Sequence, residues 1–426
     1  LLLSIIILLL LLVLYFCAKK TIRHFFWNIK RVLAVIAYKL LRHFPKKKNK
    51  VIFGADNGDG FAGNPKYLFY EALKLPNIQC VWITKNKKVF KTLQKHGYPV
   101  EMAYTMKGIR TQLQAKTAIM SHSIKEDFSC LAVCGATTVN LWHGVGLKRS
   151  WFRNQTSYAG KAYARMRATG KKGFAWTWAT TNQSKENYVV STSERVGAYY
   201  PETYNIDTKH ILSLGQARND LFFDDSLEEG YLPDFFRDKK VITYMPTHRN
   251  YGKGNGIAEK NIGRNIDYAK LSKMLEKYGY IFVIKQHRWL TKKGTNINMP
   301  NIIDITHENY DIDAQMVLKY TDVLITDYSS CYTDFLLLDR PVLFYCYDLY
   351  EYLDKWELNF DFDEVTPGPK AFNSDELIDE LEKILAGQDA YEQDRQRVKR
   401  IFYSPENQGL VAKKQMQYIM DEIINK

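Results

Sequence analysis

Short apolar segments alternate with amphipathic segments along most of this chain, and no other sequence feature restricts its fold more. From Lys50 onward, the strand-like segments of a first series read KVIFGAD, QCVWIT, TAIMSHS and TVNLWHG. Helix-like segments such as NPKYLFYEALK and KKVFKTLQKHG lie between them. The strand-like segments of a second series read HILSLG, KVITYMPT, YIFVIKQH, DVLITDYSS and PVLFYCY. Strands that alternate with helices in this order predict an α/β fold with mostly parallel sheets and helices on their faces.

The two series predict two domains, for which a chain of 426 residues is long enough. The stretch 224–240 is acidic and then basic, contains glycine and proline, and is interpreted as a linker. We therefore expect an N-terminal domain over residues 51–230 and a C-terminal domain, with covering helices at its end, over residues 231–426. Two such halves that face each other form a cleft, and ligands of α/β sheets bind beyond the carboxyl ends of the strands.

The first eighteen residues are the most apolar part of the chain. Residues 1–18 read LLLSIIILLLLLVLYFCA and carry no charge. As a helix they would span roughly 27 Å, close to the hydrocarbon core of a bilayer at about 30 Å. They lack the basic region and the small-residue cleavage site of a signal peptide. We therefore predict a transmembrane anchor over residues 1–18.

A basic segment, residues 19–50, follows this predicted anchor. It contains 11 Lys and Arg residues and no acidic residue, which leaves +3 (14 minus 11) of the net charge of +14 for the rest of the chain. Positive charge after a span predicts that the body of the protein lies on the cytoplasmic side of the cell membrane. Apolar residues recur in the segment at helical steps, at Ile22, Phe26, Ile29, Leu33, Ile36 and Leu40.

This pattern predicts an amphipathic juxtamembrane helix on the inner leaflet, attracted by anionic lipids. A basic helix packed on the folded body is the alternative. Because the charge lies beside the apolar segment, nucleic acid is not an expected partner. Six scattered cysteines favour buried thiols over a metal site, and we expect no metal and no cofactor. The chain has no glycine-rich loop of the P-loop or dinucleotide type, which disfavours kinases, ATPases and Rossmann dehydrogenases.

Five predicted strand ends carry polar side chains, in the segments LWHGVGLK, LGQARND, YMPTHRN, VIKQHR and ITDYSS. Each alone has a structural explanation, such as a histidine in a turn, a local ion pair or a helix cap. Together they lie where an α/β cleft opens. The candidate site residues are His143, Gly144, Lys148, Arg218, Asn219, Asp220, Thr247, Arg249, Lys285, His287, Thr326, Asp327, Tyr328, Ser329, Ser330 and, in the segment that follows, Asp334.

The segment ITDYSS predicts a phosphate site. Ser329 and Ser330 at the start of a helix would present hydroxyls and backbone N–H groups at the positive end of the helix dipole. Arg218, Arg249 and Lys285 would add charge-assisted hydrogen bonds to the same anion. These residues predict a cleft for a diphosphate-linked donor, with His143 from one half and His287 from the other.

With these motifs the chain resembles the CDP-glycerol glycerophosphotransferases of teichoic acid and capsule synthesis. The family is similar in its WHG…LK strand end, G-x-x-R-N-D turn, P-T-x-R turn, basic-x-His strand end and T/S-D-Y-S-S helix start, in this order. The segments RPVLFYCYDLYEY and PGP also resemble its closing segments. The similarity extends from about Val51 to near the C-terminus.

The resemblance implies a two-domain, GT-B-like architecture with Rossmann-like halves and a CDP-polyol donor. His143 and His287 correspond to two histidines that transfer requires, with His143 as the base and His287 acting on the phosphate. Arg249, Asp327 and the two serines correspond to the donor diphosphate and nucleotide site. The implied reaction moves glycerol phosphate from CDP-glycerol to a lipid-linked glycan or polyol-phosphate acceptor and releases CMP.

Several alternatives stay open at this point. A CDP-ribitol donor fits the same motifs, and a GT-B glycosyltransferase with a nucleotide sugar would use a similar diphosphate site. A membrane-bound binding protein with a degenerate cleft is disfavoured because the motif residues are intact. The chain departs from the frequent HGTPLK pattern at Val145 and Gly146. This difference predicts a looser loop beside His143, at which the acceptor would be selected.

Overall fold

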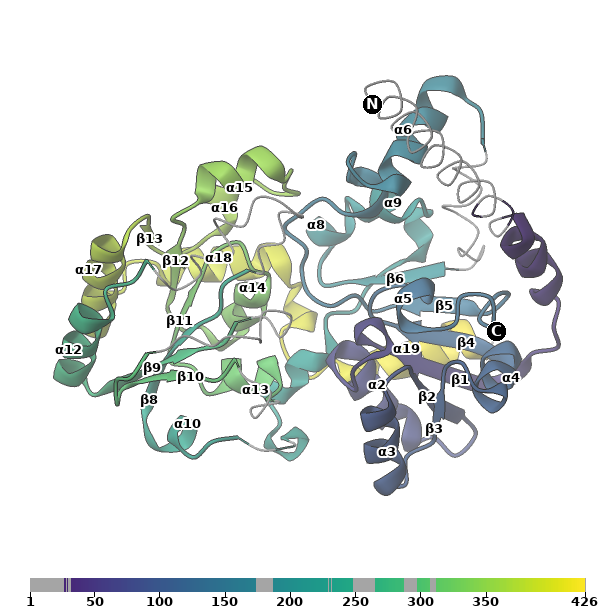
Figure 1. The fold of residues 1–426 in the computed structure, drawn as a ribbon, viewed down its shortest axis with the longest axis horizontal. Coiled ribbons are helices and arrows are strands. Elements are labelled where there is room, and N and C mark those ends of the chain that lie inside the picture. Colours follow the sequence, from purple (N-terminus) through teal and green to yellow (C-terminus); the bar gives the residue numbers. More distant parts are fainter. Residues whose placement is uncertain are drawn as a thin grey trace, which may run out of the picture.

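The computed structural model describes residues 27, 29, 32–173, 187–228, 230, 232–247, 265–286, 297–306 and 312–425. Within them the chain forms two parallel sheets with helices around them (Figure 1). The predicted α/β fold with two parallel sheets is therefore confirmed.

The first sheet has seven strands in the order β3-β2-β1-β4-β5-β6-β7, and all neighbours are parallel. Its strands are β1 (Lys47–Gly54), β2 (Gln79–Thr84), β3 (Val100–Met102), β4 (Ala115–Met120), β5 (Thr137–Asn140), β6 (Asn187–Ser191) and β7 (Ile211–Ser213). The segment HILSLG, predicted to open the second series, forms β7 instead, which pairs with β6 in this sheet. The strand β6 was not predicted from the sequence.

The second sheet has six strands in the order β10-β9-β8-β11-β12-β13, again with parallel neighbours. Its strands are β8 (Lys240–Tyr244), β9 (Tyr280–Ile284), β10 (Ile302–Asp304), β11 (Val323–Thr326), β12 (Val342–Tyr345) and β13 (Lys370–Ala371). In chain order, six strands of each sheet follow the doubly wound order 3-2-1-4-5-6, which has its switch point between the first and fourth strands. The switch points lie between β1 and β4 and between β8 and β11.

Helices surround both sheets. Those of the first half are η1 (Asp56–Gly58), α2 (Gly63–Leu73), α3 (Lys87–Lys95), α4 (Met106–Gln114), α5 (Ile124–Asp127), η2 (Trp151–Arg153), α6 (Tyr158–Thr169), α8 (Glu194–Gly197), α9 (Tyr200–Tyr204), η3 (Thr208–His210), η4 (Ala217–Phe222) and η5 (Asp225–Leu227). Helix α10 (Phe235–Asp238) lies beside β8 of the second half (Figure 1). Those of the second half and the C-terminal segment are α12 (Tyr268–Tyr278), α13 (Ala314–Lys319), α14 (Cys331–Phe335), η7 (Leu336–Leu338), α15 (Leu349–Lys355), α16 (Phe362–Val365), α17 (Ser374–Leu385), α18 (Glu392–Phe402), η8 (Pro405–Asn407), α19 (Ala412–Ile419) and η9 (Met420–Ile424). Asparagine, threonine and aspartate caps start several of them, as at α3, α4 and α12.

One buried hydrophobic cluster spans both halves, while two further clusters lie within one half each. Apolar side chains of both sheets belong to a single buried cluster, which includes Phe53 and Val139 from the first and Leu324 and Phe344 from the second. The C-terminal segment joins the halves further, since α18 lies beside the second half and α19 packs against α2 of the first (Figure 1). Elements η5 and α10 lie in the stretch that was interpreted as a linker.

Part of the predicted juxtamembrane segment is helical in the structure. Residues 32–41 form a helix, and the side chains of Leu33 and Leu40 are 59% and 70% exposed. The strand β1 begins at Lys47, within this segment. Among the described residues no helix has the length and apolar character that a membrane span requires. The anchor predicted for residues 1–18 lies outside the described residues.

Candidate functional site

His143 stands on a sharply turned loop directly after β5. Trp142 has φ of 57°, a left-handed conformation that a bulky side chain rarely adopts, and Gly144 has φ of 135°. The Asn140 side chain stabilises the turn, because its Oδ1 accepts a 2.9 Å hydrogen bond from the Trp142 backbone N–H. Strained backbone of this kind persists where the surrounding structure holds it, and it is frequent at functional sites.

The His143 ring is fixed by a backbone carbonyl. Its Nδ1 lies 3.0 Å from the carbonyl oxygen of Ser121, the residue after β4. Because a carbonyl only accepts hydrogen bonds, Nδ1 carries the proton and Nε2 keeps its lone pair. Burial, the neighbouring His122 and Arg218 lower the pKa of His143 to about 3, against the opposing effect of the Ser121 bond. His143 is therefore neutral at neutral pH, in the tautomer that can accept a proton at Nε2.

A second histidine, His122, was missed in the sequence although it also stands at a strand end. Its ring stacks on His143 with centroids 4.1 Å apart and an interplanar angle of 12°. Its Nδ1 lies 2.8 Å from Ser121 Oγ. The carboxylate of Asp127 is fully buried and accepts backbone N–H bonds from Asn57, Ser121 and His122. Burial raises the pKa of Asp127, while His122 and these N–H groups lower it. Asp127 thus joins the loops after β1 and β4, at the switch point of the first sheet.

The first and second halves meet at Gly144. A Cβ atom built on Gly144 would lie 3.0 Å from Arg218 Nη2 and 3.0 Å from Ser330 Oγ. A side chain at this position would force both groups away, and the positive φ adds strain for any other residue. Three of the predicted motifs therefore come together here: the His143 loop, the Arg218 turn and the start of α14.

The Arg218 turn forms a buried network with the second half. Arg218 Nη1 donates to the His143 carbonyl at 2.9 Å, and Nη2 pairs with the carboxylate of Asp334, which is fully buried in α14. Asn219 Nδ2 donates to the same carboxylate at 3.0 Å. Gln315 Nε2 and the Tyr403 hydroxyl complete the set of donors around Asp334. We call these five residues the buried junction.

Asp220 is directed elsewhere. Both of its carboxylate oxygens accept backbone N–H bonds of 2.8 Å, from Val411 and from Ala412 at the start of α19. Burial raises the pKa of Asp220 to about 6, although these two bonds oppose the shift. Asp220 thus anchors the last helix. A role in substrate binding stays a prediction for the three residues of this turn.

The second-half motifs lie at the switch point of the second sheet. Asp327 Oδ1 accepts hydrogen bonds from the backbone N–H and the hydroxyl of Thr247, which joins the loops after β8 and β11. Thr326 Oγ1 donates to the Met245 carbonyl at 2.7 Å. Ser330 immediately precedes α14, as the sequence predicted, and Ser329 Oγ accepts from the Cys331 N–H at 3.5 Å.

Three further candidates contact protein groups in this region. Lys285 follows β9, and its Nζ donates to the Ile312 carbonyl at 3.0 Å. The Tyr328 ring stacks on Tyr352 with centroids 3.8 Å apart. Lys148 reaches the same part of the second half, with its Nζ 4.9 Å from the ring centroid of Tyr352 and 4.6 Å from that of Trp356. His287 and Arg249 lie outside the described residues, so that their placement stays a prediction.

The loop beyond His143 is not loosened at Val145 and Gly146, contrary to the expectation from the sequence. Val145 is fully buried. Asn359 Nδ2 donates to the carbonyls of Gly146 and Lys148 at 2.9 and 3.1 Å, and its backbone N–H donates to the Leu147 carbonyl at 2.7 Å. We call this contact between residues 146–149 and 357–359 the clip. It holds the loop through main-chain carbonyls.

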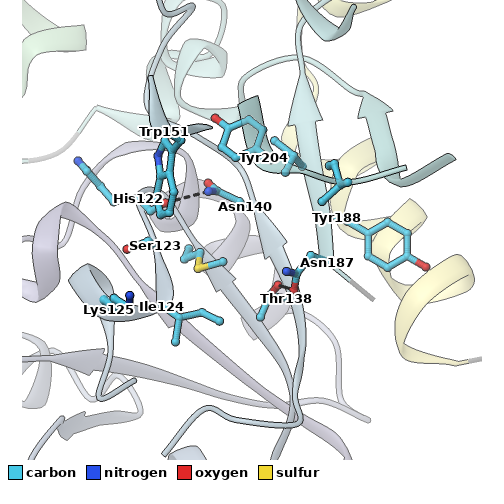
Figure 2. A pocket seen from close by; sticks show the side chains of 13 residues that line it. His122, Ser123, Ile124, Lys125, Thr138, Asn140, Trp151, Asn187, Tyr188 and Tyr204 are labelled. Carbon is cyan, nitrogen blue, oxygen red and sulfur yellow. Dashed lines mark hydrogen bonds between the residues drawn. The ribbon is translucent and has the colours of Figure 1, made fainter. Parts of the chain in front are cut away.

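A pocket opens beside His122 (Figure 2). Its walls come from the ends of β4, β5 and β6 and from η2, α5 and α9, so all of them belong to the first half. We call it the His122 pocket, lined by Met120, His122, Ser123, Ile124, Lys125, Thr138, Asn140, Trp151, Asn187, Tyr188, Val189, Tyr204 and Ile206.

Comparisons with known proteins agree with this architecture. The model of a family described as CDP-glycerol:poly(glycerophosphate) glycerophosphotransferase matches residues 36–421. The solved structure of the wall teichoic acid polymerase TagF has a TM-score of 0.65 at 22% sequence identity, over 96% of both chains. At this identity the structural likeness supports the fold alone.

Curated relatives include enzymes for two different polyols. The chain is 26% identical over 373 residues to a teichoic acid poly(ribitol-phosphate) polymerase of Bacillus spizizenii, covering 84% of this chain and 55% of the relative. It is 27% identical over 355 residues to a teichoic acid glycerol-phosphate transferase of Staphylococcus aureus, covering 82% of this chain and 86% of the relative. The chain spans 55% and 62% of the lengths of two ribitol-phosphate polymerases.

Proposed function

The chain belongs to the CDP-glycerol:poly(glycerophosphate) glycerophosphotransferase family, and we propose that it transfers glycerol phosphate from CDP-glycerol to an acceptor hydroxyl and releases CMP. The acceptor is a lipid-linked glycan or a polyol-phosphate chain. One observation supports this proposal most. The neutral His143 stands on the loop whose Gly144 contacts Ser330, at the start of α14. A proton acceptor from one half therefore lies close to the predicted phosphate site of the other.

In the proposed reaction, Nε2 of His143 takes the proton of the acceptor hydroxyl. The hydroxyl oxygen forms a bond to the phosphorus that carries glycerol, and the bond from this phosphorus to the bridging oxygen of CMP breaks. CMP leaves with that electron pair. A positioned base contributes typically 10²–10⁴-fold to such a rate. The negative charge of a bound donor would raise the pKa of His143, because it stabilises the imidazolium that forms.

The second half would hold the donor. Ser329, Ser330 and backbone N–H groups at the start of α14 are suited to phosphoryl oxygens, and the bonds between Asp327 and Thr247 keep the two loops in place. Lys285, His287 and Arg249 are proposed to bind the diphosphate, with His287 as the donor of a hydrogen bond or proton. For His287 and Arg249 this proposal rests on the sequence motifs alone.

Glycerol and ribitol are the two candidates for the polyol of the donor. A ribitol-phosphate polymerase and a glycerol-phosphate transferase are both relatives at similar identity. Incubation of the protein with CDP-glycerol or with CDP-ribitol, each with membrane lipid as the source of acceptor, will identify the donor. The expected result is release of CMP with one donor well above the other.

Residues 1–50 are proposed to hold the enzyme at the inner face of the cell membrane. The apolar residues 1–18, the 11 basic residues that follow and the exposed Leu33, Ile36 and Leu40 support this. Sedimentation with vesicles that contain anionic lipid tests the proposal. We expect binding that weakens with salt, and no binding after deletion of residues 1–46, which leaves β1 intact.

The proposed base is tested by His143→Ala. We expect CMP release to fall by roughly 10²–10⁴-fold, the usual contribution of a general base. His96→Ala is the matched control, because His96 is an exposed residue directly after α3. If His143→Ala keeps activity within a few-fold of the wild type, His143 is not the base. Equal denaturation midpoints for the two variants will exclude unfolding as the cause.

A further inference from the structure

We propose that the His122 pocket is an acceptor subsite that binds a sugar ring next to the unit with the reacting hydroxyl. This inference rests on the proposed function, since it names part of the acceptor for the same site. Three observations support the proposal. They are the pocket itself, its position beside the His143 loop and the chemical character of its lining residues.

The pocket lies in a different half of the molecule from the proposed donor site. Its lining residues lie between Met120 and Ile206, and all of them come from the first half of the chain. The loops proposed to hold the donor diphosphate follow β8 and β11 of the second half. A ligand in the His122 pocket would therefore contact the half that carries His143, and not the half that is proposed to hold the donor.

Three walls of the pocket contact the catalytic loop directly. His122 stacks on His143 with ring centroids 4.1 Å apart. Tyr204 makes an edge-to-face contact with Trp142 at 5.6 Å. Asn140 donates to the His122 carbonyl at 2.8 Å and accepts from the Trp142 N–H at 2.9 Å. A ligand bound here would rest against the residues that hold the proposed base.

The lining suits a sugar ring. The aromatic side chains of Trp151 and Tyr204 border the pocket, whereas the Tyr188 ring points away from it, toward His210 (Figure 2). Flat aromatic rings and aliphatic side chains pack well against the C–H face of a pyranose, with a few polar groups at the edge to orient it. Thr138 supplies such an edge, since its hydroxyl is bonded to the Asn187 side chain.

The charge of the lining residues further restricts the classes of ligand that the pocket can bind. None of the described residues that line the pocket is acidic, and Lys125 adds a positive charge to the lining. A cationic ligand is therefore disfavoured. A bare glycerol phosphate chain offers few C–H surfaces for the rings of Trp151 and Tyr204, so a glycan unit fits better than a polyol-phosphate unit.

The test fills the pocket. Ile206→Trp places a large side chain in it, and Leu410→Trp introduces the same residue at a position that is 53% exposed in the C-terminal segment. Transfer is measured with a panel of disaccharide methyl glycosides as soluble acceptors, and with oligo(glycerol phosphate) as a second class. We expect Ile206→Trp to raise KM for the glycoside at least about tenfold, with the KM for CDP-glycerol unchanged. Leu410→Trp should change neither.

A second variant, Trp151→Leu, removes one aromatic wall without filling the pocket and should raise the glycoside KM less. An unchanged glycoside KM in folded Ile206→Trp would overturn the proposal. Equal increases for glycoside, oligo(glycerol phosphate) and CDP-glycerol would overturn it as well. Calorimetric titration of the glycoside without donor keeps the two proposals distinguishable. If the wild type releases no CMP but binds the glycoside and Ile206→Trp does not, the proposed function fails and the subsite stands.

Discussion

Two of the contacts that join the halves of the molecule differ in chemical character. In the buried junction, the bonds run between side chains, and the carboxylate of Asp334 is the common acceptor for Arg218 and Asn219. In the clip, the acceptors are the main-chain carbonyls of residues 146–148, and Asn359 is the principal donor. Both contacts hold the same loop, because Arg218 also donates to the His143 carbonyl.

This difference predicts how changes in each contact will affect the His143 loop. A charge that is taken out of water depends on its partner, so removal of one member of the buried junction leaves the other uncompensated. A half-exposed backbone contact has water as a substitute partner, and its loss is less costly. The buried junction should therefore control stability, whereas the clip should control the precision of the loop.

The largest effect is expected for Asp334→Asn. Arg218, whose side chain is 14% exposed, would lose its counter-charge, and breaking a buried pair in this way costs about 3–5 kcal/mol. Chemical denaturation measures the loss in the free energy of unfolding. Asp375→Asn is the matched control, because the side chains of Asp375 and its partner Lys270 are 78% and 44% exposed and the loss of this pair should cost less than about 1 kcal/mol. Similar losses for the two variants would contradict the comparison.

A smaller effect is expected for Asn359→Ala. The change removes the two bonds to the carbonyls of Gly146 and Lys148 and the acceptor of the Arg153 guanidinium, at a cost of about 1–3 kcal/mol. The denaturation midpoint measures it. Glu357→Gln probes the same clip through its exposed ion pair with Arg149, and should cost less than about 1 kcal/mol. If Glu357→Gln destabilises the protein as much as Asn359→Ala, the clip depends on charge and not on the main chain.

The sequence predicted the parallel sheets and the strand ends because both leave local patterns. Apolar runs separated by helical segments are visible over six or more residues, and Ser330 precedes a helix as ITDYSS indicated. Edge strands of two or three residues, such as β13, are too short to show a period. The parallel order of both sheets then follows from the connections.

The partners of the motif residues could not be predicted in the same way. Arg218 and Asp334 are 116 residues apart, and only the assembled fold brings them together. Sequence reasoning interpreted Arg218 as a phosphate ligand, although its guanidinium is bonded to Asp334 and to the His143 carbonyl. The clip was hidden because main-chain carbonyls have no sequence signature. His122 was hidden because a single histidine after a strand is usually structural.

The smallest change in stability, but an informative one, is expected for His122→Asn. The His122 ring stacks on that of His143, and the electrostatic effect of His122 lowers the pKa of His143. Burial, which lowers the pKa of His143 most, and the effect of Arg218 would both remain in the variant. The pKa of His143 should therefore rise from about 3 part of the way toward its ordinary value.

This change has a defined sign in the pH profile of CMP release. A base works when it is neutral, so activity falls as the pH falls through its pKa. In a profile of kcat/KM, which reports the free enzyme, the acid limb of the wild type should lie near pH 3, and in His122→Asn it should move to higher pH while the rate at pH 8 changes little. His96→Asn, at the end of α3, should leave the limb in place. An acid limb that stays or moves to lower pH would show that His122 supports the ring of His143 without setting its charge.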